Sequence, residues 1–232
     1  FSRMGAQLRC ELLNVKKEIR MQRLRSVGPI IHRLALGLSL VVLLLLPAAG
    51  QAATDPTEAR TFIIALADRA IAALTPTNIT REVREQRCRE LLRANFAVET
   101  IGQFVLGRYW RSATPEERQD FMTLFENFIV GTYADRFSRY AGQRLDVSDA
   151  TTEPETGDAI VKSQIERTDG APVQVAWRVR QMSEGLRIVD VIIEGVSMGV
   201  TQRSDFASVI RSNGGTVSGL IDQMRKRAGS AG

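Results

Sequence analysis

The hydrophobic pattern of this chain changes its period at about Gly142. Before this residue, apolar side chains recur every three or four positions, as on one face of a helix. After it, apolar and polar side chains alternate, as they do along a half-buried strand. A second set of short helical segments closes the chain. This order predicts an α+β fold in which helices pack on one face of a curved, mainly antiparallel sheet.

Two of the predicted helices begin with a recognisable capping sequence. Asp55-Pro56-Thr57-Glu58 places a capping carboxylate before a proline in the first turn. Thr114-Pro115-Glu116-Glu117 repeats the arrangement, with Thr114 as the cap and Glu117 closing a capping box. Elsewhere the helical spacing of apolar residues sets the approximate limits. We predict helices over residues 55–74, 80–106, 114–140, 204–211 and 217–227.

The alternating region contains short segments separated by turn residues. Asp169-Gly170 and Ser183-Glu184-Gly185 are typical of turns between strands. Consecutive strands joined by such turns form an antiparallel meander, with one face polar and the other apolar. We predict strands over residues 144–149, 159–167, 173–180 and 186–194.

The first part of the chain has the organisation of an export signal. Several arginines precede an unbroken apolar run at residues 34–46, and small residues follow at 48–53. This order is that of a secretory signal peptide with cleavage after Ala52. The apolar run of 13 residues is shorter than the ~20 that a membrane span needs. An uncleaved leader that holds the protein at the membrane is the alternative.

We therefore divide the chain into a leader, 1–52, and one domain, 53–232, and expect the domain in the periplasm. Met4 or Met21 is the expected start, and the residues before it are interpreted as translated upstream sequence. The leader holds eight of the 31 Lys/Arg and two of the 26 Asp/Glu, which leaves 23 basic and 24 acidic residues. A nucleic-acid-binding domain needs a clustered excess of positive charge. The nearly neutral balance excludes nucleic acid as a partner.

Residue types that catalysis and metal binding require are missing from the domain. Its sequence contains no histidine, because His32 lies in the leader, and this excludes a Ser-His-Asp triad and histidine-containing zinc sites. Residues 195–199 match the hydrolase pattern G-x-S-x-G, but Ser197 has no histidine base, so we interpret them as a turn. Cys88 is interpreted as a packed residue. We predict a protein that is not an enzyme and uses no cofactor or metal.

Aromatic side chains form a wide stripe along the helix predicted over 114–140. They follow one another at spacings of three and four, so they share one helix face. Such a stripe either packs against the sheet as ordinary core or forms one wall of a cavity, and both interpretations stay open at this point. The stripe consists of Phe121, Leu124, Phe125, Phe128, Ile129, Tyr133, Phe137 and Tyr140.

Two sequence signatures resemble those of a known family. The first comprises residues 104–110 (FVLGRYW) and 114–116 (TPE); the second comprises 177–180 (WRVR) and 188–197 (IVDVIIEGVS). Together they resemble the MlaC (toluene-tolerance) family over nearly the whole of the predicted domain. The resemblance also accounts for the G-x-S-x-G match, because a G-V-S turn is part of the second signature.

The resemblance implies a soluble periplasmic protein that binds phospholipid. It implies exchange of lipid between an outer-membrane lipoprotein complex and an inner-membrane ABC transporter complex, which maintains outer-membrane lipid asymmetry. The helices and sheet are expected to enclose an apolar cavity for the acyl tails. Leu186 and residues 200–203 (VTQR) depart from the usual pattern, and the version at 201–204 (TQRS) looks closer to the HpnM-like branch. A membrane-associated accessory protein for hopanoid traffic is therefore the alternative.

The aromatic stripe and the apolar face of the sheet are the predicted walls of this cavity. The predicted lipid-binding residues are Phe104, Val105, Tyr109, Trp110, Phe125, Phe128, Ile129, Tyr133, Val161, Ile165, Val175, Trp177, Val179 and Ile188.

Overall fold

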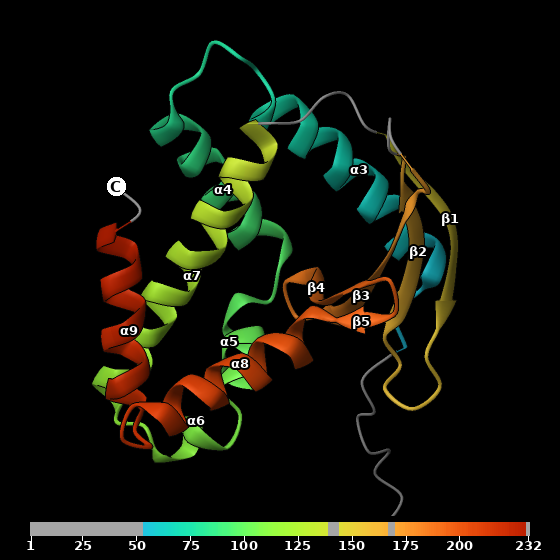
Figure 1. The fold of residues 1–232 in the computed structure, drawn as a ribbon. Helices are drawn as coiled ribbons and strands as arrows, with labels where there is room; N and C mark the ends of the chain where they lie inside the picture. Colours follow the sequence, from blue (N-terminus) through green and yellow to red (C-terminus); the bar gives the residue numbers. More distant parts are fainter. Residues whose placement is uncertain (1–52, 139–143, 167–169, 231–232) are drawn as a thin grey trace, which may run out of the picture. The chain divides into compact units, whose positions relative to one another are not determined.

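A computed structural model describes residues 53–138, 144–166 and 170–230 (Figure 1). The predicted leader, Tyr140 and Asp169 lie outside these residues. Helices come first, then strands, then helices, as predicted. The elements are α3 Pro56–Leu74, α4 Arg81–Asn95, α5 Val98–Leu106, α6 Arg108–Ser112, α7 Pro115–Ser138, β1 Leu145–Thr152, β2 Ala159–Ile165, β3 Val173–Met182, β4 Gly185–Ile193, β5 Val196–Ser197, α8 Met198–Ser212 and α9 Val217–Ser230.

The strands form one antiparallel sheet in the order β1-β2-β3-β4-β5. Val161 lies opposite Trp177, and Trp177 lies opposite Val191. Helix α3 packs on one face of β1 and β2. Ile63 and Leu66 of this helix belong to the same buried cluster as the strand residues that alternate onto that face. The predicted fold class, helices on an antiparallel sheet, is confirmed.

The start of the described chain is tied to the sheet. Thr54 is buried, its N–H donates to the carbonyl of Gly157 at 2.8 Å, and its hydroxyl accepts from the N–H of Gln181 at 2.9 Å. The carboxylate of Asp55 then accepts from the N–H groups of the first turn of α3. The predicted cap at Asp55 is therefore confirmed, and it starts α3 against the sheet.

The helix predicted over 80–106 is wrong in one respect, because the structure has two helices there. Phe96 adopts an extended conformation and forms a parallel bridge with Ile188. The N–H of Ala97 donates to the carbonyl of Ile188 at 2.9 Å. These contacts with β4 replace the helical hydrogen bonds and separate the charged α4 from the apolar α5. Gly107, with a positive φ of 58°, then separates α5 from the short α6.

Helix α7 begins with the predicted capping box. The N–H of Glu117 donates to the hydroxyl of Thr114 at 3.2 Å, and the N–H of Thr114 donates to the carboxylate of Glu117 at 2.9 Å. Phe121 and Phe125 of this helix stack on each other, and Phe206 of α8 packs against both with its ring edge. Phe121, at the start of the aromatic stripe, is therefore ordinary core between α7 and α8.

The helix predicted over 204–211 begins earlier than expected, at Met198. Ser197 supplies the cap, because its hydroxyl accepts from the N–H of Val200 at 3.0 Å. The predicted range missed residues 198–203 because they follow the last strand without a connecting loop. This position of α8 brings its first turn beside β4.

A carboxylate on α7 joins this helix to α4. Glu126 accepts hydrogen bonds from Arg89 at 2.6 Å and from Arg93 at 3.0 Å, and its side chain is 14% exposed. Burial acts to raise the pKa of Glu126, but the hydrogen bonds from the two arginines outweigh it. The pKa of this carboxyl therefore lies below its usual value.

We expect the two ion pairs of Glu126 to make the free energy of unfolding depend on pH in the acid range. Because the folded pKa of Glu126 lies below the unfolded value of about 4.3, its contribution is complete above that value and is lost as the pH falls through the folded pKa. Glu126→Gln is expected to lower the free energy of unfolding by about 1–2 kcal/mol at pH 7 and to flatten its decline in acid. Urea unfolding between pH 7 and pH 3 measures both effects.

Glu155→Gln is the matched control, because this carboxylate is exposed and forms no ion pair within the described residues. A Glu126→Gln protein with the stability of the control at every pH would contradict the role given to Glu126.

Candidate functional site

An apolar cavity of about 630 Å³ lies between the helices and the sheet. It lies where three clusters of buried side chains meet: one among α5, α7, α8 and α9, one between α3 and the sheet, and one among α3, α4 and α7. Each cluster is packed within itself, and the space between them is left open. Helices α3, α4, α5 and α7 line one side of this space, and strands β1 to β4 and the start of α8 line the other.

Helix α7 supplies a continuous strip of the lining. Its cavity-facing residues are spaced by three and four, so they lie above one another on a single helix face. Phe128 and Tyr133 are 43% and 36% exposed, which is unusual for large apolar side chains and reflects the open cavity beside them. The lining residues of α7 are Phe125, Phe128, Ile129, Thr132, Tyr133, Arg136 and Phe137.

The sheet side of the cavity is centred on Trp177. Its indole Nε1–H donates to the hydroxyl of the buried Ser163 at 2.9 Å, and that hydroxyl donates to the carbonyl of Val175 at 2.9 Å. The polar edge of the ring is thus satisfied inside the sheet, and the ring is held in one orientation. Val175 and Trp177 are two residues apart on β3, so their side chains lie on the same face of the sheet, and both contribute apolar surface to the cavity.

Helices α3 and α4 complete the helix side of the cavity, and the sequence did not indicate that they line it. Leu66, Ala70 and Leu74 of α3 and Leu92 of α4 line the cavity. Cys88 also lines it, and burial raises the pKa of its thiol, which keeps the thiol protonated at neutral pH. These positions were predicted only as helical core, because a stripe of apolar residues has the same spacing whether it faces a packed core or a cavity.

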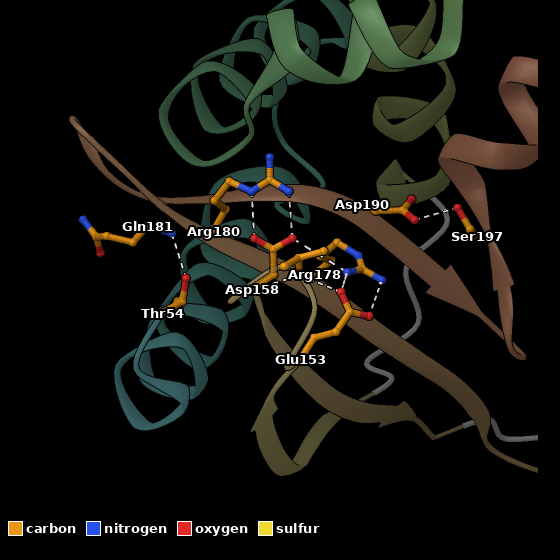
Figure 2. A network of polar contacts seen from close by, with 9 residues as sticks. Thr54, Glu153, Asp158, Arg178, Arg180, Gln181, Asp190 and Ser197 are labelled. Carbon is orange, nitrogen blue, oxygen red and sulfur yellow. Dashed lines mark hydrogen bonds and ion pairs between the residues drawn. The ribbon is translucent and has the colours of Figure 1, made fainter. Parts of the chain in front are cut away.

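Asp190 and Ser197 form a polar group beside the cavity (Figure 2). The hydroxyl of Ser197 donates to one carboxylate oxygen of Asp190 at 2.6 Å. The other oxygen accepts from the N–H groups of Gly199 at 3.0 Å and Val191 at 2.9 Å. Ser197 therefore caps α8, and Asp190 holds this cap against β4. The G-x-S-x-G sequence is the turn between β4 and α8, as the sequence analysis interpreted it.

Eight of the fourteen predicted binding residues line the cavity: Val105, Phe125, Phe128, Ile129, Tyr133, Ile165, Val175 and Trp177. Three others, Val161, Val179 and Ile188, are fully buried against α3. They lie on the same face of the sheet, but α3 covers them.

Of the remaining three predicted residues, Phe104 is exposed, and Tyr109 and Trp110 are partly buried against the core cluster among α5, α7, α8 and α9. Phe104 of α5 is 43% exposed beneath the guanidinium of Arg203. Tyr109 accepts a hydrogen bond from Arg108, and Trp110 lies under Arg118. None of the three lines the cavity.

Among the described residues, no helix is both long and apolar enough to cross a bilayer. Across the same part of the chain, no group of three or more His, Cys, Asp or Glu side chains is arranged to hold a metal ion.

The fold and the cavity together define an α+β protein built around an internal apolar space. The family model described as MlaC protein matches residues 65–226, which include all of the residues that line the cavity except Ile63. The chain belongs to the MlaC family, and the resemblance found in its sequence is confirmed.

Two curated relatives match shorter stretches. The intermembrane phospholipid transport system binding protein MlaC of Haemophilus influenzae is 27% identical over 137 residues, which are 56% of this chain and 62% of that protein. The toluene tolerance protein ttg2D of Pseudomonas putida is 26% identical over 115 residues, 50% of this chain and 53% of that protein. The chain thus spans between about half and three fifths of the length of these relatives.

A solved structure has the same fold. The phospholipid-binding protein of Ralstonia solanacearum, determined in complex with a phospholipid, aligns with a TM-score of 0.65 and 24% sequence identity. The alignment covers 76% of this chain and 98% of that one. The helices and sheet described above are therefore the architecture of that protein as well.

Proposed function

We propose that this protein binds a phospholipid by its acyl tails and carries it between membranes. The observation that carries the proposal is the cavity of about 630 Å³, whose lining is apolar on the helix side and on the sheet side alike. The names of the relatives and the phospholipid bound to the Ralstonia protein support the same ligand class. The role is one of binding, without a catalysed reaction.

The energetics of lipid transfer explain why such a cavity is needed. Exposing an acyl tail to water costs roughly 0.8 kcal/mol per CH₂, so a tail of ~16 carbons does not cross an aqueous space unaided. A carrier must offer surroundings about as apolar as the bilayer, so that loading and unloading are nearly balanced. Phe128, Ile129 and Trp177 offer such surroundings.

The finer proposal places this exchange in the periplasm. Residues 1–52 would be removed on export, and residues 53–232 would exchange lipid between an outer-membrane lipoprotein complex and an inner-membrane ABC transport system. The Haemophilus relative is named as the binding protein of an intermembrane phospholipid transport system, which supports this assignment. Such exchange would maintain the lipid asymmetry of the outer membrane.

A second candidate ligand is a hopanoid, with the protein as a membrane-associated accessory to hopanoid traffic. The observation in its favour is the position of Thr201 and Gln202. Both belong to the stretch that departs from the usual family sequence, and both line the cavity. A change in these residues therefore alters surface that the ligand contacts.

Native mass spectrometry of residues 53–232, purified from a bacterial periplasm, tests the proposal. We expect a bound species with the mass of a diacyl phospholipid, identified after organic extraction. A hopanoid in its place would favour the second candidate. A protein that carries no lipid and takes none from vesicles would refute both.

The location of the tails can be tested with the two tryptophans of the chain, Trp110 and Trp177. A phospholipid with brominated tails is expected to quench Trp177 in a Trp110→Phe protein, because Trp177 lines the cavity. It should leave Trp110 unquenched in the matched Trp177→Phe protein. Equal quenching of both would place the tails outside the cavity.

A further inference from the structure

Two of the residues that line the cavity carry a charge at neutral pH, Arg136 on α7 and Asp190 on β4. Arg136 lies in the last turn of α7, and Asp190 lies beside the first turn of α8. Figure 1 shows these two turns well apart along the molecule. An amphiphilic ligand in the cavity therefore meets charges of opposite sign at two different places.

The carboxylate of Asp190 already has its hydrogen-bond partners. It accepts from the hydroxyl of Ser197 and from the N–H groups of Gly199 and Val191, at distances between 2.6 and 3.0 Å. These hydrogen bonds fix the start of α8, so neither the carboxylate nor its three donors are available to a ligand. The negative charge next to the cavity also disfavours an anionic group on this side.

Arg136 differs from Asp190 both in its partners and in the sign of its charge. Its guanidinium lies over the ring of Tyr133, 5.3 Å from the ring centroid, and both residues line the cavity. Within the described residues it has no carboxylate partner within 4.0 Å. An exposed guanidinium held on an aromatic ring beside an apolar space keeps its N–H donors for an anion that arrives with an apolar ligand.

We propose that Arg136 binds the phosphate of the lipid headgroup, so that the cavity selects phosphate-bearing lipids over uncharged lipids with the same tails. The inference rests on the proposed function, because it assumes tails in the cavity. Guanidinium groups bind phosphate oxygens through two parallel hydrogen bonds, which are stronger than hydrogen bonds between neutral groups. The headgroup then lies at the last turn of α7, and the tails extend from Tyr133 toward Trp177.

A competition between two lipids tests this assignment. Delipidated protein receives phosphatidylglycerol and diacylglycerol with identical acyl chains from the same detergent micelles, and native mass spectrometry gives the ratio of the two bound species. The wild-type protein is expected to favour phosphatidylglycerol. Arg136→Gln is expected to lower the ratio about tenfold, with diacylglycerol binding unchanged. Because the readout is a ratio, partial unfolding of the variant does not affect it.

Arg111→Gln is the matched control. Arg111 also lies in the last turn of its helix, α6, is exposed and does not line the cavity. The control should keep the wild-type ratio. An unchanged ratio in Arg136→Gln, or an equal loss of both lipids, would overturn the assignment. A wild-type protein that binds neither lipid would instead refute the proposed function itself.

Inorganic phosphate separates a headgroup site from a general anion site. Titrated into the lipid-free protein, it should show no binding in the concentration range in which phosphatidylglycerol saturates, because it lacks the contribution of the tails. Binding of inorganic phosphate in that range, lost in Arg136→Gln, would show a phosphate site independent of the lipid and would overturn the inference.

Discussion

Replacing Ile129 with tryptophan is expected to reduce the uptake of phospholipid from vesicles by more than about tenfold while the protein stays folded. Ile129 lies on α7 between Phe125 and Tyr133 and faces the cavity. The larger indole would extend into space that the acyl tails need. Uptake of a labelled phospholipid by delipidated protein, compared with wild type, measures the effect.

The stability of the same variant distinguishes a cavity from a packed core. In a packed core, an added ring forces neighbours out of their rotamers and costs about 1–3 kcal/mol. In an open apolar cavity the ring gains contacts without displacing any, so the free energy of unfolding should stay the same or rise. Val179→Trp provides the contrast, because Val179 is fully buried beneath α3. It is expected to destabilise the protein.

Thr123→Trp is the matched control on α7, since Thr123 is exposed and does not line the cavity. It should retain full lipid uptake. Val175→Trp approaches the cavity from the sheet and provides a second blocking variant if Ile129→Trp does not fold. Normal uptake in both blocking variants would mean that the lipid binds elsewhere.

The parts of the fold that the sequence predicted are those with local causes. The capping box of Thr114 and Glu117 is formed by residues three apart, and the alternation of Val175 and Trp177 follows from the geometry of one strand. Neither depends on another part of the chain. Their positions could therefore be predicted without knowing the tertiary structure.

The features of the fold that the sequence analysis missed depend on contacts with residues of another element. The break at Phe96 exists because Ala97 donates to Ile188, a residue far along the chain. The start of α8 is held by Asp190 on another element, β4, which accepts a hydrogen bond from Ser197 across the intervening turn. Such partners become neighbours only after folding, and no local pattern marks them.

The candidate site was predicted in part for the same reason. Val161 and Val175 are both inward-facing residues of the sheet, and their sequence patterns are equivalent. Only the position of α3 decides that Val161 is covered and that Val175 faces the cavity. Likewise, a helix that faces a cavity has the same apolar spacing as one that faces a core, which is why the residues of α3 and α4 were not predicted as lining.

Replacing Asp158 with alanine is expected to cause a large loss of stability, about 2–4 kcal/mol. The side chain of Asp158 is 1% exposed, and its two oxygens accept from Arg180 at 2.7 and 2.8 Å (Figure 2). Arg178 lies 3.7 Å from the same carboxylate and also binds Glu153. Without Asp158, two neighbouring guanidinium groups would lose their shared buried anion.

The expected loss of stability is smaller than for a fully buried ion pair, because the two arginine side chains are partly exposed to solvent. The side chains of Arg178 and Arg180 are 24% and 31% exposed, so solvent compensates part of their charge when Asp158 is removed. Urea unfolding followed by circular dichroism measures the loss. Asp120→Ala is the control, because its ion pair with Arg225 is more than half exposed and should contribute less than about 1 kcal/mol.

A double-mutant cycle decides whether the loss comes from the ion pair itself. If Asp158 and Arg180 are coupled, Asp158→Ala combined with Arg180→Met should cost less than the sum of the single changes, because the double variant leaves no buried charge unpaired. Additive losses would mean that Asp158 acts through the loop that precedes β2. A loss no larger than that of Asp120→Ala would show that this cluster, on the face of the sheet opposite α3, does not hold the sheet together.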